Sequence, residues 1–465
     1  MDEENKESIK FKISGAISSD MVFQRNEKIR IWGTAERNGL KIYGEFMGEK
    51  IETRTEDSGR WILEFSPHSA TLKPQSMKIY AEEGEAVILE NLLIGDVYFI
   101  TGQSNAELNL NCCISATPED KNDLQSDTIR LFAQSREYVI EHPELWNTPQ
   151  EDIIHPDWKW ERTTEETAYK FSALGYYFGK ELSKTIKEIP IGLIMAAAGG
   201  AQIVELMPEE TARQQGYTVS AAVGIAGYYN TLIHPFIKMP VRAVLFYQGE
   251  SESNPENCPH YGDDLAAFVN VLRGRWNIPF RFYNVQLSSH GKGSYEYWPS
   301  IGELRAAQYQ AIKEIPDYYV TVAMDCGFAE GDPDFAHPLY KKVPGQRLAK
   351  LILSTEYGIL DMEYASSPYP VSVEWAEDRA LLTFRYVGNG LKTFTENDAL
   401  IGFQIEQNGE RKDAVAQIVG RNTVQVRFNT NADAICYGMQ QTAGTDVANL
   451  VNSELLPAPA FRMAR

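Results

Sequence analysis

Five short apolar runs, separated by stretches of helical periodicity, constrain the fold of this chain more than any other feature. The runs are DVYFIT (96–101), IGLIMAA (191–197), RAVLFY (242–247), RFYNVQL (281–287) and YVTVAM (319–324). The helical stretches cover 171–186, 263–276, 301–315 and 339–357. Buried strands that alternate with helices are typical of an α/β unit with a parallel sheet. We therefore expect an α/β domain over residues 94–360.

Two β-rich regions flank this domain. Residues 1–93 carry short runs such as KIRIWGTA and WILEFS between Gly, Asn, Asp and Pro, and residues 361–465 carry VSVEWA, ALLTFRY and TVQVRFN at similar spacing. Short strands between turn residues indicate all-β units. We expect an antiparallel β-sandwich at the N-terminus and a second β domain at the C-terminus, in line with the length of 465 residues. The polar stretch from about 112 to 160 is interpreted as a long excursion that lines a substrate cleft.

The charge of the chain limits its partners. The formal net charge is −20, and phosphate binding depends on Lys and Arg, so we expect neither a nucleic-acid partner nor an anionic membrane. The N-terminus MDEENKESIKFKI lacks the charge and apolar run of a signal peptide. The chain is therefore predicted to be cytoplasmic, although a secreted chain trimmed of its leader would look the same. The oligomeric state is left open.

Ser104 is the first candidate for catalysis. It follows the strand DVYFIT through Gly102 and Gln103, which places it on a sharp turn at the carboxyl end of a sheet strand, where ligands bind in open α/β sheets. An exposed hydroxyl beside free backbone N–H groups suits a nucleophile. The alternative is a serine that only caps the next helix. The sequence also differs from the G-x-S-x-G elbow, because Ala106 takes the place of the last glycine.

His337, in GDPDFAHPLY, is the candidate base. Asp334 lies three residues earlier, so one turn lets its carboxylate bond one ring nitrogen while the other faces the serine. Asp332 is the fallback for this orienting role. The alternative is an N-capping Asp and a solvated His before a proline.

Two further strand ends carry groups suited to an oxyanion hole. Gly199 and Gly200 follow IMAAA, and Gln248, Gly249 and Glu250 follow VLFY. A glycine allows a backbone N–H to approach a reacting carbonyl, and a side-chain amide can point at the same place. We expect Gly200 and Gln248 to meet Ser104 because all three follow strands of one sheet.

These residues resemble the SGNH (GDSL-type) hydrolase superfamily, and within it the sialate O-acetylesterase-related carbohydrate esterases. The similarity covers most of the chain. It rests on SSDMVFQRNEKIRIWGTA, GDVYFITGQSNAE, PIGLIMAAAGGAQIVELMP, VRAVLFYQGESE, DFAHP and the closing NLVNSELLPAPAFR. The resemblance implies a three-layer α/β/α domain with a parallel central sheet, flanked by the two β domains.

The resemblance also implies roles for individual residues. Ser104 would be the nucleophile, His337 the general base and acid, and Asp334 its orienting partner. The oxyanion would lie among the Ser104 backbone, Gly200 and Gln248. Asn105 and Glu250 would be supporting residues, and neither a metal nor a cofactor is expected. The reaction would be a two-step hydrolysis through an acetyl-enzyme.

The sequence departs from the family pattern around the site. Alanine stands at 106 where the family has Met, and Ala198, Phe246 and either Leu206 or Met207 stand where it has Trp. These positions flank the nucleophile and the oxyanion loops, so we expect a pocket shaped for a different glycan.

The function expected is therefore a carbohydrate O-acetylesterase, with an O-acetylated carbohydrate as substrate. A charge of −20 disfavours anionic sialates unless a cation such as Arg305 compensates, and neutral acetylated xylo- or manno-oligosaccharides are the alternative. Salt screening keeps both open. Two other classes are a non-catalytic carbohydrate-binding protein with a relic site, which the joint presence of Ser104, Asp334 and His337 disfavours, and a lipase or thioesterase, which the β domains disfavour.

Overall fold

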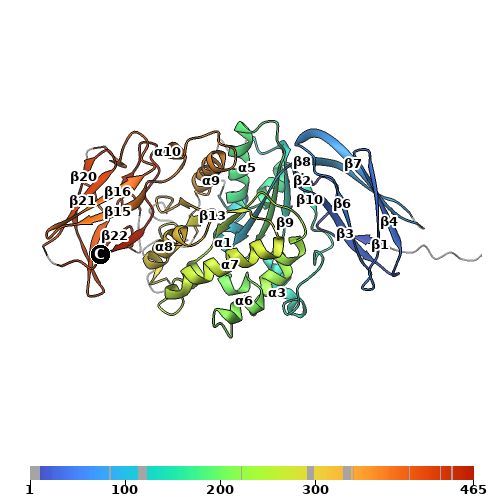
Figure 1. Cartoon of the computed structure of the whole chain (residues 1–465), viewed down its shortest axis with the longest axis horizontal. Coiled ribbons are helices and arrows are strands. Elements are labelled where there is room, and N and C mark those ends of the chain that lie inside the picture. The colour runs from blue at the N-terminus through green and yellow to red at the C-terminus, as the bar shows by residue number, and fades with distance from the viewer. Residues whose placement is uncertain are drawn as a thin grey trace, which may run out of the picture.

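The computed structural model describes residues 11–82, 85–113, 123–220, 222–290, 298–327, 337–338, 340–396, 398–429, 431–440 and 444–465. Along the longest axis of the molecule, strands of the N-terminal region lie at one end and strands of the C-terminal region at the other, with helices and parallel strands between them (Figure 1).

A parallel sheet forms the middle of the molecule. Its strands run in the order β10-β9-β11-β8-β12-β13-β14. Their bounds are β8 Val87–Gly102, β9 Ser126–Ala133, β10 Trp160–Thr163, β11 Ile191–Ala197, β12 Ala243–Tyr247, β13 Arg281–Gln286 and β14 Tyr318–Val322. All neighbours in this order pair in parallel except β10 with β9. β11 and β12 are buried along their whole length, as expected for a sheet covered on both faces.

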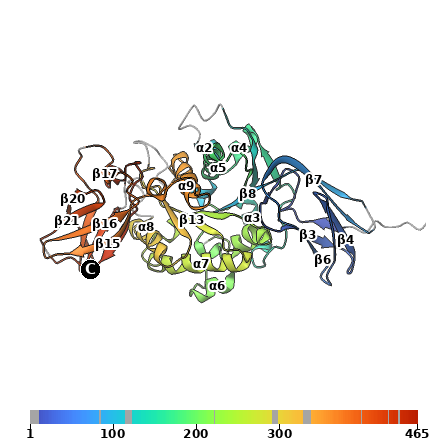
Figure 2. The ribbon, with the colours of Figure 1, turned by 45° about the horizontal axis from the view of Figure 1, so that its top comes forward.

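Helices cover both faces of this sheet. Figure 1 shows α5 (Ala173–Thr185) and α9 (Lys342–Thr355) over one face, and α6 (Glu209–Gln214) and α7 (Tyr261–Trp276) over the other; α5 and α9 lie side by side in Figure 2 as well. α5 buries Leu174, Phe178 and Leu182, and this spacing of four places them on one helix face. The remaining helices are α1 Ser104–Glu107, α2 Leu110–Cys113, α3 Arg136–Glu141, α4 Glu165–Lys170, α8 Ile301–Gln310 and α10 Met362–Ala365.

The N-terminal strands are continuous with the central sheet. β8 pairs with β7 (Thr71–Ala81) and β2 (Val22–Gln24) before it enters the parallel sheet. The predicted boundary between residues 93 and 94 thus falls inside one strand. β4 (Lys41–Phe46) and β5 (Glu49–Arg54) extend this sheet, while β1 (Phe11–Ile13), β3 (Ile29–Ala35) and β6 (Arg60–Phe65) form a separate three-stranded sheet.

The C-terminal region is built from strands. One four-stranded sheet holds β15 Tyr369–Trp375, β16 Arg379–Arg385, β21 Thr423–Arg427 and β20 Val415–Gly420, and another holds β19 Glu410–Asp413, β18 Phe403–Gln407, β22 Ala434–Tyr437 and β24 Phe461–Ala464. β17 (Lys392–Thr393) pairs with β23 (Leu450–Val451). Aromatic rings from both four-stranded sheets, including Phe384 and Phe461, meet in their shared core.

The five predicted strands are confirmed as β8, β11, β12, β13 and β14, and the mixed α/β class is confirmed with them. The interpretation of 112–160 as an excursion alone was wrong, because residues 126–133 form β9, an inner strand of the sheet. Its first three residues, SDT, are polar, which hides the apolar second half. Residues 114–122 lie outside the described part.

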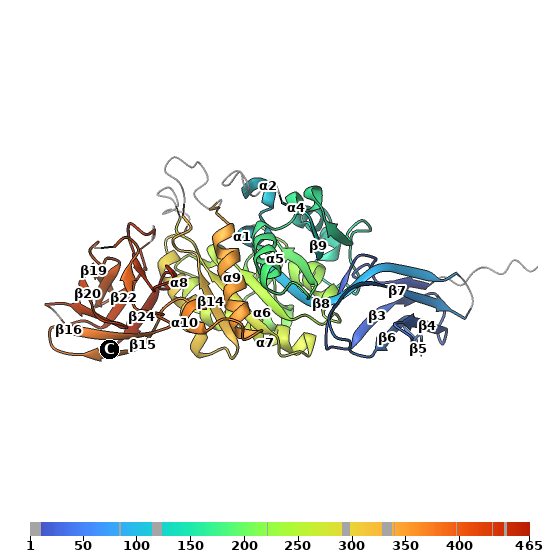
Figure 3. The same ribbon diagram turned by 90° about the horizontal axis from the view of Figure 1, so that it is seen from above.

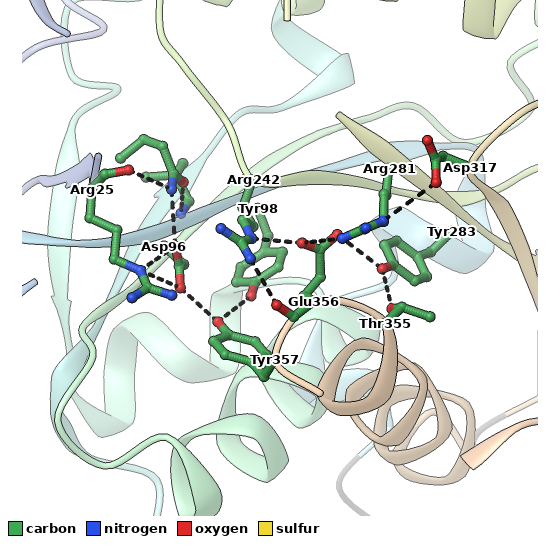
Figure 4. A network of polar contacts seen from close by, with 12 residues as sticks. Arg25, Asp96, Tyr98, Arg242, Arg281, Tyr283, Asp317, Thr355, Glu356 and Tyr357 are labelled. Carbon is green, nitrogen blue, oxygen red and sulfur yellow. Dashed lines mark hydrogen bonds and ion pairs between the residues drawn. The ribbon is translucent and has the colours of Figure 1, made fainter. Parts of the chain in front are cut away.

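A buried polar cluster lies at the amino ends of the parallel strands (Figure 4). Asp96, fully buried on β8, pairs with Arg25 just after β2 at 3.0 Å and accepts the Tyr357 hydroxyl at 2.7 Å. Glu356, at the end of α9, pairs with Arg242 at 2.8 Å and with Arg281 at 2.9 Å. We call these residues, with Tyr98, Tyr283 and Thr355, the amino-end cluster; it ties the N-terminal strands, the sheet and α9 together.

Within the described ranges, no helix combines the length and apolar character needed to cross a bilayer.

Candidate active site

The carboxyl ends of three adjacent strands lie level with one another. In the sheet register Gly102 of β8 is the partner of both Ala197 of β11 and Tyr247 of β12. The segments that follow these three residues therefore begin at the same edge of the sheet. This confirms the expectation that the loops carrying Ser104, Gly200 and Gln248 would lie together.

A glycine is required at the turn that presents Ser104. Gly102 has φ +131°, and a Cβ there would lie 2.2 Å from the Tyr247 carbonyl oxygen. The chain then enters α1, whose first residue is Ser104. The Gln103 side chain accepts the N–H groups of Gly249 at 3.0 Å and Ser251 at 3.4 Å. These bonds join the loops after β8 and β12 and fix the turn.

Ser104 and His337 are in hydrogen-bond contact. His337 Nε2 lies 2.9 Å from Ser104 Oγ, although the two residues are 233 positions apart in sequence. This is the distance needed for a general base to take the hydroxyl proton. Asp334 and the fallback Asp332 lie outside the described residues, so the third member of the expected triad stays a prediction.

A buried chain of polar contacts supports the nucleophile and the base. Asn105, next to Ser104, donates to Glu250 Oε1 at 2.5 Å and accepts from Lys341 Nζ at 2.6 Å. Lys341 also donates to the Pro338 carbonyl at 2.7 Å, directly after His337. All three side chains are at most 3% exposed. Burial raises the pKa of Glu250.

Lys341 was not among the site residues predicted from the sequence, although it binds Asn105, next to Ser104, and Pro338, next to His337. The only signal for it in the sequence is its spacing of four residues from His337.

Gly200 lies at the exposed edge after β11. It is exposed and has φ +77°, and its carbonyl accepts the Ser251 hydroxyl at 3.0 Å. Its N–H donates to no other residue in the described ranges. The N–H of Ser104, at the first position of α1, is likewise outside the helix ladder. Two backbone donors are thus available at this edge.

The placement of Gln248 does not fit the oxyanion role expected for it. The side chain is fully buried, and its amide nitrogen donates to the Ala201 carbonyl at 3.1 Å and to the Glu252 carboxylate. Since an amide has two N–H groups, both are occupied. Glu252 also accepts the Ile203 N–H at 2.6 Å, and burial raises its pKa to about 8. Gln248 therefore links the loops after β11 and β12.

The positions that depart from the family pattern do not form a sugar-binding surface. They are all fully buried: Ala106, Ala198, Leu206, Met207 and Phe246. Phe246, for example, packs against Phe268 and Phe282. The expectation that these replacements reshape the pocket directly is not supported, because their side chains belong to the core.

Arg305, the cation considered for an anionic sugar, is fully buried. It donates to the carbonyls of Leu287 at 3.0 Å, Ser288 at 2.5 Å and Gln440 at 2.9 Å. Burial lowers its pKa to about 10. Arg305 thus joins the segment after β13 to the C-terminal region.

Among the described residues, no group of three or more His, Cys, Asp or Glu side chains is arranged to hold a metal ion.

Comparisons with known proteins identify the family of this chain. A family model for carbohydrate esterases, described as sialic acid-specific acetylesterase, matches residues 94–354. The sialate O-acetylesterases of Pongo abelii and Homo sapiens are each 26% identical over 416 residues, covering 81% of this chain and 77% of those proteins. The crystal structure of a carbohydrate acetylesterase from Xanthomonas citri matches with a TM-score of 0.83 and 25% identity, covering 98% of this chain and 99% of that one. The structural match therefore includes both β-rich ends.

Proposed function

The chain belongs to the sialic acid-specific acetylesterase family of carbohydrate esterases, and from this premise we propose that it removes O-acetyl groups from sugars through an acetyl-enzyme formed on Ser104. The observation that carries the mechanism is the 2.9 Å contact between Ser104 Oγ and His337 Nε2. In this proposal Asp334 orients the ring of His337 through the other nitrogen, within an SGNH-type three-layer domain between two β domains.

The first step acylates the serine. Ser104 Oγ attacks the acetyl carbonyl carbon, and its proton passes to Nε2 of His337. The N–H groups of Ser104 and Gly200 stabilise the oxyanion that forms. The bond between the carbonyl carbon and the sugar oxygen then breaks, and the departing oxygen takes the proton from His337.

The second step releases acetate. Water attacks the acetyl-enzyme and gives its proton to His337, and the tetrahedral intermediate collapses to acetate while Ser104 Oγ takes the proton back. Lys341, Asn105 and Glu250 hold the segments that carry the nucleophile and the base during both steps.

Hydrolysis of 4-nitrophenyl acetate tests the mechanism. Ser104→Ala should lower kcat by about four orders of magnitude or more, because the members of a triad act as a unit, and His337→Ala should lower it similarly. Ser183→Ala on α5, whose hydroxyl bonds only its own helix at Lys180, is the matched control. Equal rates for Ser104→Ala and the parent enzyme would sink the serine mechanism.

The acetylated sugar is a separate question. A neutral xylo- or manno-oligosaccharide is favoured over a sialate by the net charge of −20 and by the burial of Arg305. Acetate release from acetylated sialosides, xylan fragments and mannan fragments would decide; a preference for sialosides would contradict the neutral substrate.

A further inference from the structure

Glu107 contacts the loop that carries the oxyanion donor. It is the last residue of α1, three positions after Ser104. Its Oε2 accepts the Gly199 N–H at 2.7 Å, and Gly199 immediately precedes Gly200. The short helix that presents the nucleophile therefore also holds the turn expected to bind the oxyanion.

Arg136 holds the other side of Gly199. As the first residue of α3, it donates from Nη1 to the Gly199 carbonyl at 2.7 Å, and its Nε lies 3.7 Å from Glu107 Oε2. A Cβ on Gly199 would lie 2.6 Å from Arg136 Nη1 and 2.8 Å from Glu107 Oε2. Both polar groups of the Gly199 backbone are thus bound, and a side chain at this position would have to displace both partners.

We propose that Glu107 is a positioning residue for the oxyanion hole, and that its ionised carboxylate, together with Arg136, fixes the Gly199–Gly200 turn so that the Gly200 N–H meets the acetyl oxygen. This inference rests on the proposed function, because it assigns Gly200 as an oxyanion donor. It adds an expected pH dependence to that reaction.

The surroundings of Glu107 bring its pKa close to neutral pH. Burial raises its pKa to about 7, against the opposing effects of Arg136 and the Gly199 N–H. Glu137, also on α3, competes for Arg136 at 3.3 Å and acts on Glu107 as a like charge. Tyr228, fully buried, brings a hydroxyl near the same charges.

The sign of the pH effect follows from this arrangement. Below about pH 7 the carboxyl takes up a proton, loses its attraction to Arg136 and becomes a weaker acceptor for the Gly199 N–H. Protonation of Glu107 should therefore lower the activity of the parent enzyme as the pH falls through about 7, towards the level of a variant that carries a neutral group at this position.

The test uses Glu107→Gln, which resembles the protonated acid, and Glu107→Ala, which removes the acceptor. At pH 8.5 with 4-nitrophenyl acetate, we expect kcat to fall about 5- to 10-fold in the first variant and about 10- to 100-fold in the second, with KM within about 2-fold, since lost oxyanion stabilisation acts on the transition state. The difference in kcat between the parent enzyme and Glu107→Gln should shrink as the pH falls below about 7, because the parent carboxyl is then also neutral. A burst of 4-nitrophenol counts the active sites, so misfolded enzyme does not enter kcat.

Glu137→Gln is the matched control, because it changes a neighbouring acid that pairs with Arg136 and does not contact Gly199. It should keep the parent kcat at pH 8.5. A parental kcat in Glu107→Ala, or a ratio of parent to Glu107→Gln activity that does not change with pH, would each overturn the inference. Ser104→Ala tests the proposed function independently, since it removes activity at every pH whatever Glu107 does.

Discussion

The two ends of the same parallel strands carry buried charge in different arrangements. At the amino ends, each buried acid of the amino-end cluster meets arginine: Asp96 pairs with Arg25, and Glu356 with both Arg242 and Arg281 (Figure 4). At the carboxyl ends, Glu250 bonds only the amide of Asn105 among the described residues, and its second oxygen is without a partner there.

The buried acids around the active site also hold a proton more tightly than exposed acids do. Burial raises the pKa values of Glu107, Glu250 and Glu252. Clusters of acids with perturbed pKa values are typical of functional sites, whereas one-to-one pairing of buried charges is what a structural network needs to offset desolvation. The comparison teaches that Glu250 and Glu252, beside the active site, lack among the described residues the arginine partners that the buried acids have at the amino ends.

Helix α9 connects these two ends. It begins directly after Lys341, which holds the Ser104 and His337 segments, and ends at Glu356 in the amino-end cluster. Its 14 residues span about 20 Å at 1.5 Å per residue. In Figure 3, which views the molecule from above, α9 runs beside α5 along the sheet. Substitutions at the two ends of α9 can therefore separate stability from catalysis.

The largest expected effect is on stability at the amino end. Glu356→Ala leaves Arg242 and Arg281 without their shared carboxylate. Because the two arginines are partly exposed, we expect a loss of about 3 kcal/mol of the free energy of unfolding, the low end of the range for a buried ion pair. Urea denaturation followed by tryptophan fluorescence measures the loss. The kcat of the folded enzyme should stay within about 2-fold of the parent. Glu410→Ala, on the exposed surface of β19, should change neither the free energy of unfolding nor kcat. A large fall in the kcat of Glu356→Ala without a change in stability would contradict the comparison.

The next effect is on catalysis at the carboxyl end. Lys341→Met keeps most of the buried volume but removes the bonds to Asn105 and the Pro338 carbonyl. We expect kcat for 4-nitrophenyl acetate to fall about 100-fold, which corresponds to about 2.7 kcal/mol of transition-state stabilisation. Lys313→Met, at an exposed position after α8, is the control. If Lys341→Met keeps the parent kcat but unfolds at a lower urea concentration, Lys341 stabilises the fold and does not support catalysis.

Much of the fold and the pairing of Ser104 with His337 could be predicted from the sequence. Apolar runs such as IGLIMAA are strong strand signals, and parallel strands bring their carboxyl ends to one edge. The order of the motifs along the chain therefore predicts that Ser104, Gly200 and the loop of Gln248 lie together. β9 was not predicted, because its polar first residues interrupt the apolar pattern.

Side-chain direction could not be predicted in the same way. Gln248 lies in the predicted loop, but its amide turns to Ala201 and Glu252, a choice set by tertiary neighbours. Arg136 reaches Gly199 across 63 positions of sequence, and no local pattern reports such a contact. The burial of Arg305 could not be predicted either, because the carbonyls that bind it come from other segments of the chain.

The smallest expected effect sharpens the comparison within the amino-end cluster itself. Tyr357→Phe removes a hydroxyl that donates to Asp96 at 2.7 Å and lies 2.8 Å from the Tyr98 hydroxyl, but it leaves Asp96 paired with Arg25 and Gln24. Since one net hydrogen bond contributes about 1 kcal/mol, and up to about 3 kcal/mol when its partner is charged and stays buried, the loss in free energy of unfolding should be about 1–2 kcal/mol. This loss should be smaller than that of Glu356→Ala, and kcat should not change. A loss equal to that of Glu356→Ala would show that the tyrosines, rather than the arginines, compensate the buried acids.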